Sequence, residues 1–155
     1  IKRGSASMML EYWRRPNQTE EKFNGDWLLT GDRGQFQAEG IKFIGRDDDV
    51  INSAGYRIGP SEVEDCLLMH PAVATIGIVG KPDRSRGEIV KAYVVVKFGH
   101  KADDDLIVSL QDFVKQRLAK HLYPREISFL EELPMTVTGK VVRSKLREKA
   151  ILECR

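Results

Sequence analysis

Two long runs of β-branched residues, each next to a helical pattern, constrain the fold of this chain more than any other feature. The runs cover Val73–Val79 and Ile89–Phe98 and predict buried strands, with Gly80–Gly87 between them as a polar loop. A helix is predicted before them, because Pro60 suits a first helical position and Pro71 ends the pattern. This alternation predicts an α/β domain. The buried side of the first helix is predicted to carry Val63, Leu67 and His70.

Three more segments follow the predicted strands. A long helix is predicted to begin at Asp103 or Asp104 and to continue through Leu122, because apolar residues recur at helical spacing and an aspartate can cap the first turn. A short strand follows at Ile127–Leu130. A basic helix capped by its first residue is predicted over Ser144–Leu152.

The first third of the chain has a different pattern, made of turns and short strands. Apolar and polar residues alternate over Gln35–Ile44, and Glu39-Gly40 supplies a turn, so a β-hairpin is predicted. An isolated hairpin is marginally stable in water, and we therefore expect it to pack on further protein. The acidic run Asp47–Asp49 predicts a charged, flexible linker after the hairpin.

Composition and spacing exclude several classes of protein. The 155 residues make about one domain, and contents of 41% hydrophobic and 31% charged residues argue against disorder. No run of about 18 apolar residues is present to span a membrane. A net charge of +2 is too even to indicate a polyanionic partner. The two cysteines do not suit a disulfide framework, and the three histidines lack metal-ligand spacing, so no metal site is predicted.

Three isolated residues with reactive side chains have ordinary structural interpretations. Cys66 lies inside the first predicted helix and is interpreted as a buried structural thiol. His70 and His121 fall at predicted helix ends, where histidine commonly interacts with terminal carbonyl groups. None of the three is assigned a catalytic role.

Three blocks could carry chemistry, although each has a simpler explanation when taken alone. In the block Gly25–Gly34, Asp32 follows a glycine and could accept hydrogen bonds from a vicinal diol such as a ribose. In Gly45–Glu64, a Gly-Tyr-Arg turn leads into a helix and could approach a ligand closely. In Leu133–Glu148, Lys140 follows a glycine in a loop and could meet a phosphate or carboxylate. The simpler explanations are turns, a helix cap and a solvated lysine.

Taken together and in this order, the three blocks resemble the C-terminal signatures of the adenylate-forming (AMP-binding) superfamily, which includes acyl-CoA synthetases, luciferases and peptide-synthetase adenylation domains. The resemblance covers about Glu11 to Ala150 and rests on GDWLLTGD, GRDDDVINSAGYRIGPSEVE and PMTVTGKVVR. The segment EYWRRPNQTEEKF is similar to a fourth family segment, but Glu11 stands where glycine is usual. The fold that the resemblance implies is α/β (α+β), a small C-terminal domain with a short central mixed sheet and packed helices, preceded by a β-hairpin remnant of a large N-terminal domain.

The resemblance also implies a function, that of an ATP-dependent acyl-CoA synthetase of the short- or medium-chain type. Such an enzyme joins a carboxylic acid to coenzyme A through an acyl-adenylate, using ATP with Mg²⁺ and no tightly bound cofactor. The implied roles are a catalytic cation at Lys140, nucleotide binding at Asp32 and Arg46, a hinge at Asp48, and CoA binding at Gly55, Tyr56 and Arg57.

The same resemblance implies how the chain is divided and what it meets. Residues 1–46 are expected to be the tail of the large AMP-binding domain, residues 47–49 the hinge, and residues 50–155 the mobile domain. The chain does not begin with methionine and contains no Ser/Thr/Gly-rich phosphate loop, so a fragment that is inactive alone is expected. Its implied partners are a carboxylic acid, ATP, CoA and the large domain of the same polypeptide, with no nucleic acid and no membrane. Self-association or disorder of residues 1 to about 30 is expected, as is a cytoplasmic location, with the mitochondrial matrix left open.

Two alternatives remain open at this point. The C-terminal basic helix could belong to a non-enzymatic binding module for nucleic acid or an acidic partner, although Arg147 and Lys149 are interpreted as a solvated face. The acceptor could also be a carrier protein, or the reaction a luciferin-type oxidation. Asp48 favours CoA, because acyl-CoA synthetases usually carry aspartate at this hinge position and amino-acid adenylation domains usually carry lysine.

Overall fold

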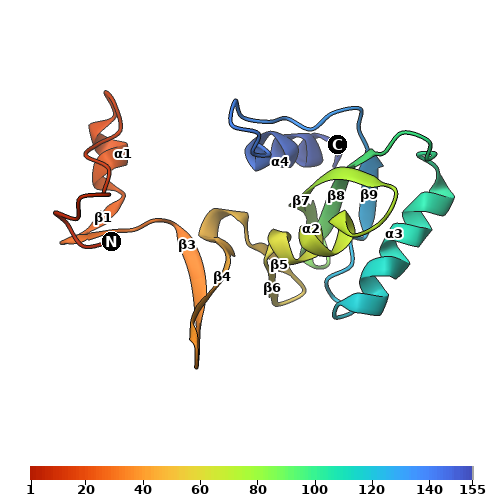
Figure 1. Ribbon diagram of the computed structural model, residues 1–155, viewed down its shortest axis with the longest axis horizontal. Coiled ribbons are helices and arrows are strands. Elements are labelled where there is room, and N and C mark those ends of the chain that lie inside the picture. Colours follow the sequence, from red (N-terminus) through yellow and green to blue (C-terminus); the bar gives the residue numbers. More distant parts are fainter. Residues whose placement is uncertain (155) are drawn as a thin grey trace. The chain divides into compact units, whose positions relative to one another are not determined.

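A computed structural model describes residues 1–154, with the side chains of Lys42 and Ile44 excepted (Figure 1). The chain divides into two units, Ile1–Phe43 and Ile44–Arg155. The first unit contains α1 (Pro16–Glu20), β1 (Phe23–Asn24) and β2 (Trp27–Leu28), and β1 and β2 pair antiparallel. It also contains β3 (Asp32–Gln37) and most of β4 (Gly40–Arg46). These last two strands form a two-stranded sheet, which confirms the predicted hairpin.

The second unit is built on a five-stranded mixed sheet. Its strands are β5 (Ile51–Ser53), β6 (Tyr56–Ile58), β7 (Val73–Asp83), β8 (Gly87–Val96) and β9 (Glu126–Phe129). The order is β6-β5-β8-β7, and β9 pairs with β8 as well. Strand β9 is parallel to β8, whereas the other pairs are antiparallel. The predicted central mixed sheet is therefore confirmed.

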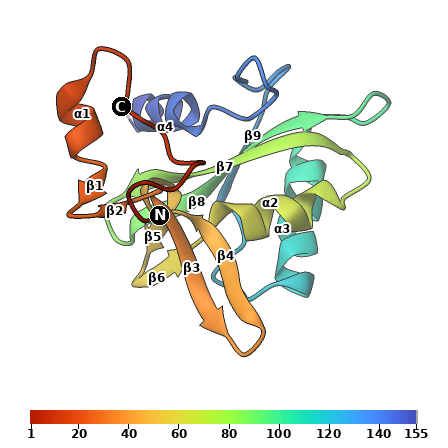
Figure 2. The same cartoon turned by 60° about the vertical axis from the view of Figure 1, so that its left-hand side comes forward.

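Three helices and a 3-10 turn complete the second unit: α2 (Pro60–Leu68), α3 (Asp104–Arg117), α4 (Arg143–Leu152) and η1 (Asp47–Asp49). Side chains alternate between the two faces of the sheet with a period of two. On β8, Ala92 joins the core that α2 and α3 cover, whereas Tyr93 joins the core on the side of α4. Figures 1 and 2 show the sheet between these two helical layers. Both faces are thus buried, which explains the nearly continuous apolar runs of β7 and β8.

Several predicted boundaries were wrong for identifiable reasons. The polar loop predicted over Gly80–Gly87 is mostly strand, because β7 continues to Asp83 and β8 begins at Gly87. The turn is only three residues long, since the Asp83 carboxylate accepts hydrogen bonds from the backbone N–H groups of Ser85 and Arg86 at 3.0 and 2.9 Å. Polar side chains in this stretch are accommodated by pairing, as in the 2.7 Å contact between Lys81 and Glu126.

Two helix ends also differ from prediction. Asp103 caps α3 as expected, with its carboxylate accepting from the Leu106 N–H at 3.0 Å, but the helix ends at Arg117 and Leu122 reaches the core from the segment beyond it. The predicted cap of α4 at Ser144 is wrong, because Val142 occupies the N-cap position and no side chain caps the helix.

The cysteine interpretation is confirmed, whereas the histidine interpretation is only partly right. His70 does lie at the end of α2, where its backbone N–H donates to the Leu67 carbonyl at 3.0 Å, but its ring does not contact a helix-terminal carbonyl, and His121 lies beyond a helix end. The His70 Nδ1 accepts from the backbone N–H of Ala72 at 3.2 Å. The ring of His121 lies beyond the end of α3 and stacks on Tyr56, with ring centroids 4.0 Å apart. Cys66 is buried in the core, and this burial raises the pKa of its thiol. None of the described helices is long and apolar enough to cross a membrane.

Candidate functional site

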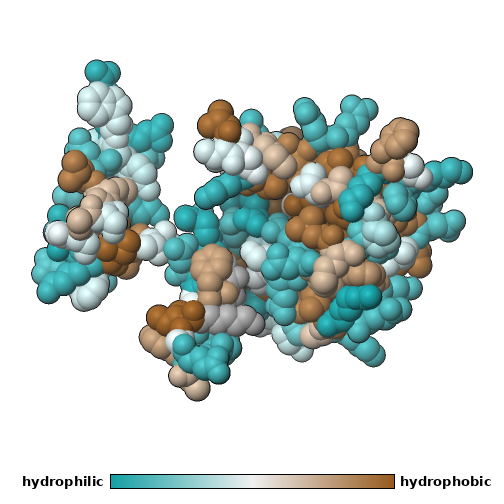
Figure 3. Space-filling view, in the orientation of Figure 1, coloured by the Kyte–Doolittle hydropathy of each residue, from teal (hydrophilic) through white to brown (hydrophobic). Residues whose placement is uncertain are grey.

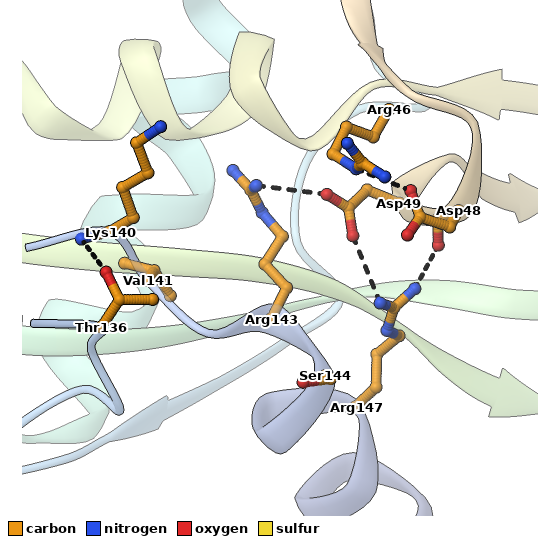
Figure 4. Close-up of a pocket in the computed structure, with 9 residues that line it drawn as sticks. All are labelled: Arg46, Asp48, Asp49, Thr136, Lys140, Val141, Arg143, Ser144 and Arg147. Atoms are coloured by element: carbon orange, nitrogen blue, oxygen red, sulfur yellow. Dashed lines mark hydrogen bonds and ion pairs between the residues drawn. The ribbon is translucent and has the colours of Figure 1, made fainter. Parts of the chain in front are cut away.

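A pocket of about 540 Å³ in the second unit brings together the acidic turn η1, the loop that carries Lys140, and the first turns of α4 (Figure 4). The residues around it are widely separated in sequence and strongly charged. They are Arg46, Asp48, Asp49, Thr136, Lys140, Val141, Arg143, Ser144 and Arg147.

The loop that presents Lys140 is a self-contained turn. The N–H of Gly139 donates to the Thr136 carbonyl at 3.0 Å, and Gly139 has a φ of +77°, which favours glycine. The backbone of Lys140 is bonded to Thr136 in both directions, with its N–H on the Thr136 Oγ1 at 3.1 Å and its carbonyl accepting from the Thr136 N–H at 2.8 Å. The turn fixes the Lys140 backbone and leaves its side chain exposed.

Arg143, three residues after Lys140, is tied to two carboxylates. Its Nη2 contacts the Glu64 Oε2 at 2.5 Å and its Nε contacts Oε1 at 3.3 Å, a forked arrangement that suits a guanidinium. Its Nη1 also lies 3.3 Å from the Asp49 Oδ2. Glu64 is itself anchored, since its Oε1 accepts from the backbone N–H of Ile78 at 2.9 Å. Burial lowers the pKa of Arg143, but the contacts with Glu64 and Asp49 outweigh it and leave the pKa raised.

Arg147 lies one helical turn further on and faces the same way. Its Nη2 is 3.3 Å from the Asp49 Oδ1, and its Nη1 donates to the backbone carbonyl of Asp48. The carboxylate of Asp49 is thus shared by two arginines of α4, Arg143 and Arg147, and its side chain is only 9% exposed. The acidic turn, predicted as a flexible linker, is held against α4.

The remaining charged pair sits at the start of the acidic turn. The Arg46 Nε contacts the Asp48 Oδ1 at 3.0 Å. Partial burial raises the pKa of Asp48, but the hydrogen bond from Arg46 and the charges of Arg46 and Arg147 outweigh it, so the pKa of the carboxyl is lowered. Asp48 is therefore an ionised partner for Arg46 near neutral pH.

Pairing leaves one cation of the pocket available. Each of the three arginines of this pocket contacts a carboxylate, as described above. The ammonium of Lys140 forms no hydrogen bond or ion pair with any residue that the structure describes, and in Figure 4 the only dashed line at Lys140 joins its backbone nitrogen to Thr136. Lys140 is thus the group that can meet an incoming anion without first breaking an existing ion pair.

The predicted site residues fall into three places. Arg46, Asp48 and Lys140 are brought together in the pocket. Gly55, Tyr56 and Arg57 lie outside the pocket lining, in the hairpin of β5 and β6. Asp32 is the first residue of β3, in the other unit.

Sequence reasoning missed four contributors to the pocket network, Asp49, Glu64, Arg143 and Arg147. Arg147 was interpreted as part of a solvated face, but its side chain is 33% exposed and paired with the acidic turn. The i, i+4 spacing of the two arginines in a basic helix was the available signal. Their acidic partners lie 79 to 98 residues away in the chain, and no local pattern reveals such pairs. Among the described residues, no cluster of three His, Cys, Asp or Glu side chains could hold a metal ion.

Comparisons with known proteins show the family to which this chain belongs. The sequence matches the family model described as the AMP-binding enzyme C-terminal domain over residues 62–140. It is 48% identical over 146 residues to a mitochondrial acyl-coenzyme A synthetase of Homo sapiens, covering 92% of this chain and 25% of that protein. It is 46% identical over 149 residues to the acetyl-coenzyme A synthetase of Bacillus subtilis (strain 168), covering 95% and 26%. The chain thus spans about a quarter of the length of the curated relatives it matches.

Solved structures give the same result. The fold is similar to an anthranilate CoA ligase in complex with anthranoyl-AMP, with a TM-score of 0.86 and 37% identity over 97% of this chain and 29% of that one. An acyl-CoA synthetase of Brucella canis matches with a TM-score of 0.69 and 43% identity, covering 94% of this chain and 27% of that one.

Proposed function

Because this chain belongs to the AMP-binding enzyme C-terminal domain family, we propose that it is the C-terminal part of an ATP-dependent acyl-CoA synthetase. In that enzyme a carboxylic acid reacts with ATP to give an acyl-adenylate and pyrophosphate, and CoA then displaces AMP to give the thioester. The chain supplies the cation for the first step and, after rotation, a surface for CoA in the second. Alone it is expected to be inactive.

The observation that carries the proposal is the unpaired ammonium of Lys140 on a fixed turn beside the acidic segment. In the first step a carboxylate oxygen attacks the α-phosphorus, and the bond to the pyrophosphate oxygen breaks. Negative charge is thereby crowded around one phosphorus atom. A preorganised cation stabilises such a transition state, and loss of one well-placed donor typically costs about 10²–10³ in kcat.

The other assigned residues act around this group. Asp32 would accept hydrogen bonds from the ribose hydroxyls, and Arg46 would lie near the same sugar. Asp48 would be the pivot, and its pairing with Arg46 would then be made or broken as the domain turns. Mg²⁺ enters as part of the Mg-ATP substrate. The described residues do not form a site for it, and we assign it no step in this chain.

CoA is the acceptor that the relatives favour, because they include acyl- and acetyl-coenzyme A synthetases. The hairpin of β5 and β6 is the proposed CoA surface, with Gly55, Tyr56 and Arg57 at its tip and second strand. We also propose the division into residues 1–46, 47–49 and 50–155 as tail, hinge and mobile domain. The proposed location is the cytoplasm, with the mitochondrial matrix as the alternative, because the relatives include mitochondrial and bacterial proteins.

The competing basic binding module has less support. Arg143 and Arg147, two of the basic residues it would need, are already engaged with Glu64 and Asp49. A polyanion would have to displace those carboxylates. Affinity for nucleic acid that falls steeply with salt, without ATP-dependent chemistry, would favour this alternative.

The test uses the full-length protein with a panel of short, medium-chain and aromatic acids. We expect acid-dependent exchange of pyrophosphate into ATP, followed by CoA-dependent thioester formation. If pyrophosphate exchange occurs and the acyl group is transferred to a carrier protein but not to CoA, the acceptor is a carrier protein and not CoA. A protein that binds nucleotide but activates no acid of the panel would contradict the proposed function.

A further inference from the structure

The acidic turn is connected to α4, the helix that follows the Lys140 loop, by a group of four side chains, Asp49, Glu64, Arg143 and Arg147, which we call the clasp. We propose that the clasp residues are positioning residues, which hold Lys140 at a fixed place relative to the pivot and so serve the adenylation step selectively. This inference rests on the proposed function, because it concerns how the same lysine is delivered.

The clasp is built to be rigid. The side chains of Asp49 and Glu64 are only 9% and 11% exposed, and that of Arg143 is 25% exposed. Separating the partners of such an ion pair leaves an uncompensated charge in a poorly hydrated place, which is unfavourable. The side chains of the clasp are therefore held close to one another. Glu64 is fixed to the sheet through Ile78. Arg143 is thereby joined to both the sheet and the acidic turn.

Lys140 depends on this link for its place relative to the pivot. About 90 residues separate it from Asp48 along the chain. Both backbone hydrogen bonds of Lys140 go to Thr136, and the base of its loop is closed by the Val142 N–H on the Pro134 carbonyl at 2.7 Å, so none of these bonds reaches the acidic turn. The nearest side chain after it that contacts the acidic turn is Arg143, in the first turn of α4. Helix α4 packs on the sheet through Leu146, and the clasp adds the direct link between α4 and the acidic turn that fixes the Lys140 loop relative to the pivot.

The proposed CoA surface is attached in a different way. Strand β5 begins two residues after Asp49 and is bonded directly into the sheet, with Ile51 opposite Ile58 and Ser53 opposite Gly87. Backbone pairing, and not the clasp, sets its distance from the pivot. Breaking the clasp should consequently misplace Lys140 more than the CoA surface.

The clasp also limits where the chain can turn. Arg147 donates to the carbonyl oxygen of Asp48, and the following residue, Asp49, is held by two arginines. Rotation that preserves these contacts must take place at or before the Cα–C bond of Asp48. Residues from the Asp48 carbonyl onward then move with the sheet as one body.

The experiment compares Asp49→Asn with Lys145→Ala in the full-length protein. Asn keeps the shape of Asp but removes the charge, and Lys145 is an exposed basic residue of the same helix, outside the pocket. Two rates are measured separately, pyrophosphate exchange and single-turnover thioester formation from acyl-adenylate supplied with CoA. We expect Asp49→Asn to lower the kcat of pyrophosphate exchange about 10- to 100-fold, because a small misplacement of the Lys140 ammonium is enough for a loss of this size. The rate of thioester formation should stay within about twofold of that of wild type. Lys145→Ala should change neither.

A double-substitution cycle separates positioning from general loss of structure. If Asp49 acts through Lys140, then Asp49→Asn should add little to the loss of exchange already caused by Lys140→Ala. Full additivity, or equal loss of both half-reactions, would overturn the inference.

If Asp49→Asn fails to fold, Arg143→Lys is measured in its place. This variant keeps the positive charge but loses the two-point contact of the guanidinium with the Glu64 carboxylate, and the same selective loss of pyrophosphate exchange is expected. An unaffected exchange rate in a folded clasp variant would also overturn the inference. Normal exchange by Lys140→Ala alone would instead contradict the proposed function.

Discussion

At the scale of single residues, pairing decides which charged groups serve structure and which remain available. The clearest case outside the pocket is Lys91, which is 4% exposed yet carries an ammonium between the carboxylates of Glu126 and Glu153 at 3.1 and 3.0 Å. Glu126 also binds Lys81, and Glu153 accepts from the hydroxyl of Tyr93. This network joins the end of α4 to the sheet through charges that would be unfavourable if left alone.

The network predicts acid sensitivity of the fold. Partial burial raises the pKa of Glu126, but hydrogen bonds and charges from Lys81 and Lys91 outweigh it and leave the pKa lowered. A carboxyl with a lowered folded-state pKa stabilises the fold above its unfolded pKa of about 4.3, and this contribution is lost as pH falls through the folded pKa. The measurement is the midpoint temperature of thermal unfolding between acid and neutral pH. At neutral pH the midpoint of Glu126→Gln should be lower than that of wild type, and it should fall less steeply than that of wild type as the pH is lowered. A decline as steep as that of wild type would contradict this role.

At the scale of elements, α4 packs closely on β7. A Cβ built on Gly77 would collide with the end of the Leu146 side chain and would lie 3.2 Å from a methyl group of Val141. Leu146 is 1% exposed, so it has little room to retreat. Glycine at position 77 therefore allows the helix that begins at Arg143 to sit directly on the sheet.

We predict that Gly77→Ala destabilises the protein by about 1–3 kcal/mol, the usual cost of overpacking a core. Leu146→Ala alone should cost about 2–5 kcal/mol because it leaves a cavity. The double variant should cost less than the sum, because the added methyl then occupies part of that cavity. Chemical denaturation of the four proteins checks this, and simple additivity would show that the two side chains do not meet.

A second element-level prediction concerns the hairpin of β5 and β6. Both central residues of its turn have positive φ, +49° at Ala54 and +85° at Gly55, which is the pattern of a type I′ turn. Alanine is poorly suited to that conformation, whereas asparagine followed by glycine is preferred. Ala54→Asn should raise stability, because asparagine tolerates the left-handed region better than alanine. Gly55→Ala should lower it by about 1–2 kcal/mol. Equilibrium unfolding measures both, and a destabilised Ala54→Asn would contradict the turn assignment.

Elements with a local sequence signal could be predicted, whereas contacts between distant segments could not. The helix from Pro60, the hairpin and the short strand near Ile127 could be predicted, because each has a local signal such as a proline, a turn or a β-branched run. Lys140, Arg46 and Asp48 could be nominated from motif order, and the structure brings them into one pocket. The clasp could not be predicted, because Glu64 and Arg143 are 79 residues apart and each resembles an ordinary helical charge until the sheet brings them together.

At the scale of the whole molecule, the two units differ in how well they bury their apolar residues. The second unit has buried clusters on both faces of its sheet. In the first unit the hairpin leaves Phe36, Ile41 and Phe43 exposed at 86%, 67% and 58%. Figure 3 shows brown apolar atoms on the visible face of this hairpin. Exposed apolar patches of this kind commonly mark surfaces that another protein covers.

We therefore predict that the 155-residue chain self-associates through the hairpin. Sedimentation velocity should show a mass that rises with concentration above that of a monomer. The variant Phe36→Ser with Phe43→Ser should shift the equilibrium towards monomer, while Phe98→Ser, an equally apolar and exposed position in the second unit, should not. A wild-type monomer at all concentrations would contradict the prediction.

In the proposed two-step reaction, Lys140 acts in one half-reaction and not in the other. The most direct measurement compares wild type with Lys140→Ala in the full-length protein, scoring pyrophosphate exchange beside thioester formation from acyl-adenylate supplied with CoA. We predict a loss of about 10²–10³ in exchange with thioester formation close to wild type. Equal rates of exchange in the two proteins, or a matching loss in both half-reactions, would contradict a role of Lys140 in adenylation alone.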